Sequence, residues 1–322
     1  MPFARDALLI DLYRLSRGVP PADFSDAALR LVASHLPFDS ALWGRFALTP
    51  EGPHQHTVHL FGLAMEMLAE LISIQPYNVV YERTAANPGR TTNTSLERVQ
   101  HSVAPAAIAV GRRLGLLHAL ATVIEEPALN LFTILTLHRN ESRHPFSERE
   151  RRYKQGITPH LVAAWRINTI QFVDGPAQTA RRLGIRALVA PQGELSVADP
   201  ELVELMREEV RGWRGPQLPD ALLPLARGNT EVFRGTAIVA SLVRRLDDGS
   251  AVIGVRRRNA LDELSARELE VAREFASGKS HKEIAALCGT SPTTVRSQLR
   301  AVYAKLGVST KVELLRQMEA AR

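Results

Sequence analysis

The sequence predicts two α+β domains with antiparallel sheets, followed by an all-α module of four helices. Three observations lead to this prediction. Strand-like alternation recurs in pairs across tight turns throughout the first 260 residues, and helical apolar stripes flank these pairs. Beyond that point the apolar period is helical only, with helix start and stop signals at short intervals. We therefore expect domain boundaries at residues 1–172, 183–258 and 261–322.

The first domain is expected to place helices at each end of an antiparallel sheet. A capping box at residues 147–150 opens the last helix, and a stripe of Ile157, Leu161, Ala164 and Asn168 should lie against the sheet. This order of elements resembles that of GAF-like sensor domains. In chain order we expect helices at 3–17 and 23–36, strands at 41–48 and 55–61, a helix at 63–74, irregular chain at 77–94, helix at 96–114 interrupted at Pro105, and strands at 116–124 and 130–138.

The second domain is predicted as a smaller α+β unit. Strands at 185–190 and 195–198 flank a turn at Gln192-Gly193, and a helix follows at 200–210. A hairpin at 232–255 then turns at Asp248-Gly249, a dipeptide typical of two-residue hairpin loops. The order resembles a PAS-like domain. An arginine run at residues 256–258 leads onward, and we interpret it as a solvated linker, with contact to a polyanion as the alternative.

Several aromatic residues of the first domain are candidates for lining a small-molecule cavity. Scattered aromatics are equally typical of a hydrophobic core, so both interpretations stay open. The candidates are Trp43, Phe46, Tyr77 and Tyr81.

Searching the same region for catalytic or metal chemistry returns little. His54, His56 and His59 lie close together, but alternation along a strand separates the third from the first two, and no carboxylate or cysteine completes a ligand set. A glycine-rich phosphate loop does not occur. We therefore expect no metal, no cofactor and no catalytic residues.

The last sixty or so residues contain the most specific local signals in the chain. Capping boxes at residues 265–268 and 280–283 open two helices. Ser291 with Pro292 opens the third, because proline's fixed φ suits the first helical position, and Gly307 ends it. A fourth helix follows. A helix, a tight turn and a second helix that share one core form a helix-turn-helix motif.

Charges along this module are sorted. Acidic side chains crowd the first helix, whereas basic side chains dominate the rest, as expected of a surface that meets phosphate. Ordinary solvated charge remains the alternative for any single lysine, but the charges, caps and spacing together favour DNA binding. The basic residues are Lys279, Lys282, Arg296, Arg300, Lys305 and Lys311.

Four separated blocks of the module resemble the LuxR-type, GerE-like helix-turn-helix. They run from Leu264 to Val271, Gly278 to Ala285, Ser291 to Arg296 and Lys305 to Val308, in the order and at the distances typical of that family. The sequence departs from the family pattern at four positions, where His281, Ala272, Cys288 and Gln298 replace asparagine, leucine, leucine and histidine.

The resemblance implies a role for named side chains. Those implied to face base edges are Arg296, Ser297 and Arg300; those implied to grip phosphate are Lys282, Thr293, Thr294, Lys305 and Lys311; those implied to dimerise are Leu314, Leu315 and Met318.

Base reading suits these residue types. A helix from Pro292 to Leu306 is roughly 22 Å long and fits the major groove. Arginine can donate two parallel hydrogen bonds to guanine, worth about 1–3 kcal/mol of discrimination. Arg296 and Arg300, four residues apart, are therefore the expected specificity residues. Phosphate neutralisation alone is the alternative for either one, because at least half of protein–DNA hydrogen bonds go to the backbone.

Composition limits the class of protein. The chain is 45% hydrophobic and 23% charged, as is ordinary for a globular protein. Its net charge of +6 agrees with a polyanionic partner. Its one cysteine excludes intramolecular disulfides and favours a reducing cytoplasm. The N-terminus does not resemble a secretory signal, and no apolar stretch reaches the length of a membrane span.

Together these observations predict a cytoplasmic bacterial transcription regulator. We expect a homodimer that binds double-stranded DNA at a partly symmetric operator. The N-terminal domains would sense a small-molecule effector, dimerise, or bias contact with RNA polymerase. The alternative is an enzyme with an appended helical module, which requires a nucleophile, a base and an orienting group in one site.

Overall fold

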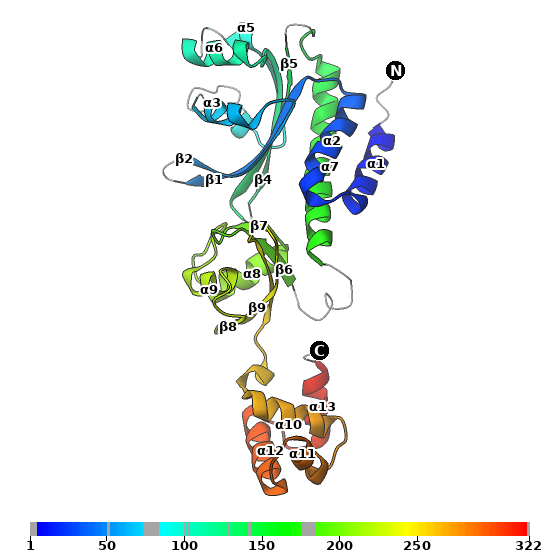
Figure 1. The fold of residues 1–322 in the computed structure, drawn as a ribbon, viewed down its shortest axis with the longest axis vertical. Helices are drawn as coiled ribbons and strands as arrows, with labels where there is room; N and C mark the ends of the chain where they lie inside the picture. The colour runs from blue at the N-terminus through cyan, green and yellow to red at the C-terminus, as the bar shows by residue number, and fades with distance from the viewer. Residues whose placement is uncertain are drawn as a thin grey trace.

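The computed structural model has three parts in a row along its long axis (Figure 1). A large sheet with its helices lies at one end, a smaller sheet in the middle, and a helical module at the other end. The residues described are 5–49, 52–73, 84–99, 101, 104–127, 129–140, 143–174 and 185–320.

The first domain is built on a five-stranded antiparallel sheet with strand order β2-β1-β5-β4-β3. Three helices, α1, α2 and α7, cover one face, and the short helices α3, α5 and α6 stand on the other side (Figure 1). The elements are α1 (Arg5–Gly18), α2 (Pro21–His35), β1 (Ser40–Thr49), β2 (Gly52–Phe61), the 3-10 helix η1 (Met65–Met67), α3 (Leu68–Ser73), β3 (Thr91–Ser95), α5 (Leu96–Val99), α6 (Pro105–Arg113), β4 (His118–Glu126), β5 (Leu131–Arg139) and α7 (Glu148–Asp174).

The core of this domain forms where the helical stripes meet the apolar face of the sheet. Leu120 and Leu135 from the sheet pack with Ile157 and Leu161 of α7, and all four are fully or almost fully buried. The predicted stripe along α7 is thus confirmed at its first three positions. Its last member is a correction: the Asn168 amide donates to Ser16 O at 3.1 Å, and so ties α7 to α1 rather than facing the sheet.

Strand β3 corrects the expected irregular chain at 77–94. Its sequence, Thr91–Ser95, has no apolar alternation because it is an edge strand held by polar contacts. The Thr91 hydroxyl lies 2.7 Å from that of Thr122, and the Asn93 amide donates to Phe146 O at 2.7 Å. Part of the predicted irregular stretch, residues 77–83, lies outside the described residues.

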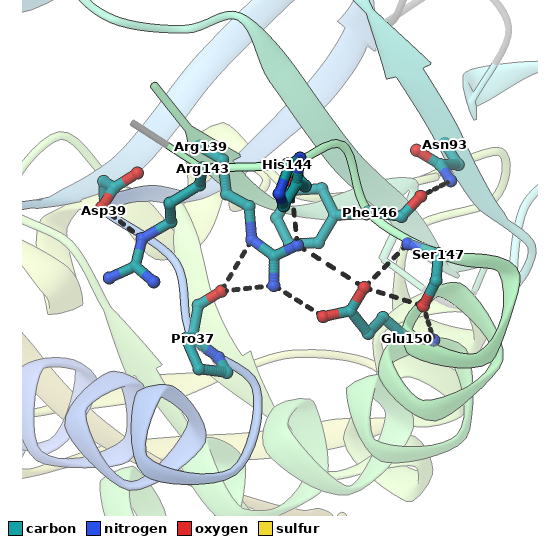
Figure 2. A network of polar contacts seen from close by, with 9 residues as sticks. All are labelled: Pro37, Asp39, Asn93, Arg139, Arg143, His144, Phe146, Ser147 and Glu150. Carbon is teal, nitrogen blue, oxygen red and sulfur yellow. Dashed lines mark hydrogen bonds and ion pairs between the residues drawn. The ribbon is translucent and has the colours of Figure 1, made fainter. Parts of the chain in front are cut away.

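A buried arginine joins three segments at one end of the first sheet (Figure 2). Arg139 of β5 donates twice to Pro37 O, at 2.9 and 2.8 Å, and to a Glu150 carboxylate oxygen at 2.6 Å. Its guanidinium also stacks over the Phe146 ring, 3.9 Å from the centroid. Glu150 closes the predicted capping box as well, since Ser147 N donates to it at 2.7 Å.

The second domain repeats the strand order of the first. Its sheet runs β7-β6-β10-β9-β8, so in both sheets the strand that comes first in the chain lies between the second and the fifth. The predicted hairpin at 232–255 consists instead of three strands. An additional turn after Arg234 separates a short strand from the two strands that flank the predicted turn at Asp248-Gly249. The elements are β6 (Ile185–Val189), β7 (Leu195–Ala198), α8 (Pro200–Glu209), the 3-10 helix η4 (Asp220–Leu222), α9 (Leu223–Ala226), β8 (Val232–Arg234), β9 (Ile238–Arg245) and β10 (Ala251–Arg257).

The C-terminal module contains helices alone, as predicted. They are the 3-10 helix η5 (Ala260–Glu263), α10 (Ala266–Ala276), α11 (His281–Leu287), α12 (Pro292–Leu306) and α13 (Lys311–Ala320). In the part of the chain that is described, none of the helices combines the length and apolarity that a membrane crossing requires.

Candidate nucleic-acid interface

Side-chain caps fix where each helix of the module begins. Ser265 and Ser280 form the two predicted capping boxes with Glu268 and Glu283. Ser291 accepts a hydrogen bond from Thr294 N at 3.1 Å, which satisfies one of the N–H groups that a helix start leaves without partners. These contacts confirm the predicted helix starts, including the start of α12 at Pro292.

Two apolar clusters hold α12 against the other helices. Its buried residues recur every three or four positions, so one side of α12 faces α10 and α11 and the opposite side faces solvent. The first cluster contains Leu264, Ala272, Val302, Leu306, Val308 and Leu314; the second contains Val271, Ile284, Ala285, Val295 and Leu299.

The solvent side of α12 carries the three predicted base-reading residues. Arg296, Ser297 and Arg300 are all exposed. The Ser297 hydroxyl donates a hydrogen bond to Thr294 O at 2.8 Å, within the helix. Among the described residues, neither arginine forms an ion pair, although arginines elsewhere in the chain commonly do. Two unpaired guanidinium groups four residues apart therefore stand on one face of a capped helix.

The predicted phosphate-gripping residues divide into two groups. Lys282, in the first turn of α11, and Thr293 and Thr294, in the first turn of α12, are exposed. Lys305 and Lys311 instead contact other side chains of the same module.

Lys305 donates to the Glu268 carboxylate at 2.7 Å. This hydrogen bond is the largest cause of the lowered pKa of Glu268. Lys311 lies over the Phe275 ring, 4.6 Å from its centroid, and His281 stacks on the same ring at 5.5 Å. A phosphate contact by Lys305 or Lys311 would have to share or break these interactions.

Sequence reasoning missed one positioning contact. Arg267 of α10 donates to the carbonyl of Cys288, the residue that caps the C-terminal end of α11, and also pairs with Glu270 at 2.7 Å. It therefore holds the turn between α11 and α12. A spacing of 21 residues between the two groups gives no local signal in the sequence. Gln298, a departure from the family pattern, is half-buried, and its side-chain oxygen has no partner among the described residues.

The predicted dimerisation residues lie on α13 with unequal exposure. Leu314 is fully buried in the module's own core, where it packs with Val302 and Leu306. Leu315 is half-buried, and Met318 is half-buried and packs against the same core. Val312, which the sequence analysis did not single out, is 59% exposed.

The arginine run before the module is not a solvated linker. Arg256 donates to Asp262 at 2.7 and 2.5 Å, and Arg258 pairs with Glu263 at 2.7 Å. Arg257 pairs with Glu208 of α8. Each arginine thus has a carboxylate partner, and the first of these contacts lowers the pKa of Asp262.

Two candidate cavity residues of the first domain, Trp43 and Phe46, lie on opposite faces of the first sheet. Trp43 is buried in the core beneath the helices, whereas Phe46, three residues along β1, points to the other face and stacks on Phe132 with centroids 5.3 Å apart. Tyr77 and Tyr81 lie outside the described residues.

The histidine group likewise separates. His56 lies 2.7 Å from Glu194 of the second domain, and His59 lies 3.2 Å from Asp26 of α2. Within the described residues, no group of three or more histidine, cysteine or acidic residues could hold a metal ion.

Comparison with known proteins identifies the helical module. Residues 262–318 match the family of bacterial regulatory proteins called the luxR family. The chain is 36% identical over 127 residues to the transcriptional regulatory protein UhpA of Escherichia coli, covering 38% of this chain and 59% of that protein. UhpA of Salmonella typhimurium is 47% identical over 57 residues, covering 18% and 29%. The chain thus spans less than two thirds of either relative.

Two solved structures are also similar to the chain. One is a LuxR family transcription factor of Burkholderia cenocepacia, CepR2, described as N-acylhomoserine lactone dependent, with 16% identity, coverage of 50% of this chain and 92% of that one, and a TM-score of 0.41. The other is SdiA of Escherichia coli, with 14% identity, coverage of 98% and 96%, and a TM-score of 0.39. From the match of its residues and its four capped helices, the C-terminal module of this protein belongs to the luxR family of bacterial regulatory proteins.

Proposed function

We propose that this protein is a transcription regulator that binds double-stranded DNA through α12. The observation that supports this most strongly is the exposed pair of arginines on α12, Arg296 and Arg300, which have no ion-pair partner among the described residues. Guanidinium groups at this spacing suit guanine edges in the major groove. Lys282 at the start of α11 and Thr293 and Thr294 at the start of α12 are exposed and suit the flanking phosphates.

Binding as a homodimer to a partly symmetric operator is part of this proposal. One small helix-turn-helix covers too few base pairs for selective binding, and two modules related by a twofold axis double the sequence read. The exposed Val312 and the half-buried Leu315 on α13 suit a contact between two modules.

The N-terminal domains, in this proposal, adjust DNA binding or contact with RNA polymerase in the cytoplasm. Their shared strand order supports their interpretation as GAF-like and PAS-like sensor domains. A small-molecule effector would bind the first sheet on the face that carries Phe46, because the other face is filled by α1, α2 and α7. We assign no catalytic residue and no cofactor.

The proposal is tested by selecting genomic DNA fragments on the purified full-length protein and sequencing those retained. We expect a partly symmetric site whose half-site centres are separated by about 10 base pairs or a multiple of it. Gel retardation should then show a shift at low salt that weakens steeply as salt rises. No enrichment and no retardation at low ionic strength would overturn the proposal.

A further inference from the structure

The first two domains share a hydrophobic core at the tip of the β4–β5 hairpin. Leu129 and Leu131 of the hairpin, together with Ala47 of β1, belong to the apolar cluster that fills the second domain. All three are at most 3% exposed. They pack in the same cluster as Leu195 and Leu222, which belong to the second domain. The first sheet therefore supplies part of the second domain's interior.

Two arginines cross this joint from different elements of the first domain. Arg45 of β1 donates to Ser196 O, and Arg166 of α7 donates to Ala198 O at 3.1 Å. Both acceptors are backbone carbonyls of β7, so each arginine ties the first domain directly to the second sheet. Arg45 is 3% exposed, which makes its charge costly unless a carboxylate lies nearby.

Glu126 supplies the carboxylate for both arginines. It lies at the end of β4, accepts from Arg45 Nη2 at 3.1 Å and lies 3.8 Å from Arg166 Nη1. Its own side chain is 10% exposed. We name Arg45, Glu126 and Arg166 the Glu126 cluster.

We propose that the Glu126 cluster couples the first domain to the second, so that the two unfold and move as one unit. If Glu126 loses its charge, Arg45 keeps a buried charge without a counterion, and the joint opens to hydrate it. The β4–β5 hairpin then becomes the route from the candidate sensing sheet to the second domain. This regulatory meaning depends on the proposed function, whereas the coupling itself does not.

The route continues toward α12 on the other side of the second domain. Strand β10 is central in the second sheet, and Arg256 at its end holds Asp262 at the start of the helical module. A displacement of the hairpin tip is therefore connected through packed or hydrogen-bonded groups to the module that carries Arg300.

The three tryptophans of the chain allow the coupling to be measured. Trp43 packs in the core of the first domain and Trp165 packs against it, whereas Trp213 packs against the core of the second. A Trp213→Phe variant reports unfolding of the first domain by fluorescence. A variant with Trp43→Phe and Trp165→Phe reports unfolding of the second. Phenylalanine at position 165 keeps an aromatic ring for Arg45, whose guanidinium lies 4.8 Å from the Trp165 ring centroid.

The test compares urea unfolding of these two reporter proteins with Glu126 intact and with Glu126→Gln. With Glu126 intact, we expect coincident transitions, the mark of one cooperative unit. With Glu126→Gln, we expect the two midpoints to separate by about 1 M urea. The matched control is Glu125→Gln, because Glu125 is the exposed neighbour on the same strand, and its transitions should stay coincident.

Two results would overturn the coupling: transitions that stay coincident and unshifted in Glu126→Gln, or transitions that are already separate with Glu126 intact. If Glu126→Gln does not fold, Glu126→Asp replaces it, because aspartate keeps the charge on a shorter side chain. The two midpoints should then separate by less than 1 M urea, and coincident midpoints in this variant would count equally against the coupling. Gel retardation at low salt distinguishes the two proposals. Loss of retardation in all proteins, with coupling intact, would reject the DNA-binding function alone.

Discussion

Arginine performs opposite tasks at the two ends of this molecule. In the first domain, Arg45 and Arg139 are buried, stack on aromatic rings and donate to carboxylates and backbone carbonyls. On α12, Arg296 and Arg300 are exposed and have no ion-pair partner among the described residues. Buried arginines of the first kind stabilise the fold, whereas exposed arginines of the second kind are available to bind another molecule.

The largest expected effect is on the buried side. Replacing Glu150 with glutamine leaves Arg139 buried without its counterion and should lower the free energy of unfolding by about 3–5 kcal/mol. Burial opposes ionisation of Glu150, yet the hydrogen bonds from Arg139 and Ser147 hold its pKa below the ordinary value. Urea denaturation measures the loss. Glu148→Gln, a change in the same turn of α7 at a side chain 59% exposed, serves as the control and should change stability little. Equal effects of the two substitutions would contradict the assignment.

A second, smaller effect is expected from acid. Burial, with a lesser contribution from the nearby Lys154, lowers the pKa of His138 from 6.5 to about 4. The unfolded chain therefore binds a proton that the folded chain rejects between these two values. The free energy of unfolding should therefore be unaffected by His138 above pH 6.5. It should fall by about 3 kcal/mol as the pH drops from 6.5 to 4.

Replacing His138 with glutamine should flatten this part of the pH profile, measured by urea denaturation at several pH values. His101→Gln, at an exposed histidine between α5 and α6, is the control and should retain the wild-type profile. A wild-type slope in the His138 variant would show that this buried imidazole is not the group responsible.

Features that depend on neighbouring residues were predictable from the sequence, whereas features that depend on distant residues were not. The helix starts at Ser265, Ser280 and Ser291 are written in neighbouring residues, and the structure confirms them. Strand β3 was missed because its polar residues are satisfied by groups distant in the chain. The Glu126 cluster was also unpredictable, since Glu126 lies 81 residues from Arg45 in sequence.

The candidate site shows the same division. The exposure of Arg296, Ser297 and Arg300 follows from the helical period of α12, which the sequence contains. The ion pair of Lys305 with Glu268 spans 37 residues and depends on how α10 and α12 pack. Likewise, the burial of Leu314 depends on how α13 packs against the core that also contains Val302 and Leu306.

The most direct test of DNA reading by α12 is the base preference of an Arg300→Ala variant. We would measure its affinity for the selected operator and for operators changed at each base pair, at several salt concentrations. We expect relaxed preference at one base pair per half-site, worth about 1–3 kcal/mol. Arg273→Ala, at an exposed arginine of α10, should leave preference unchanged. A uniform loss on all sequences with a shallower salt dependence would show instead that Arg300 only neutralises phosphate, and would contradict the account.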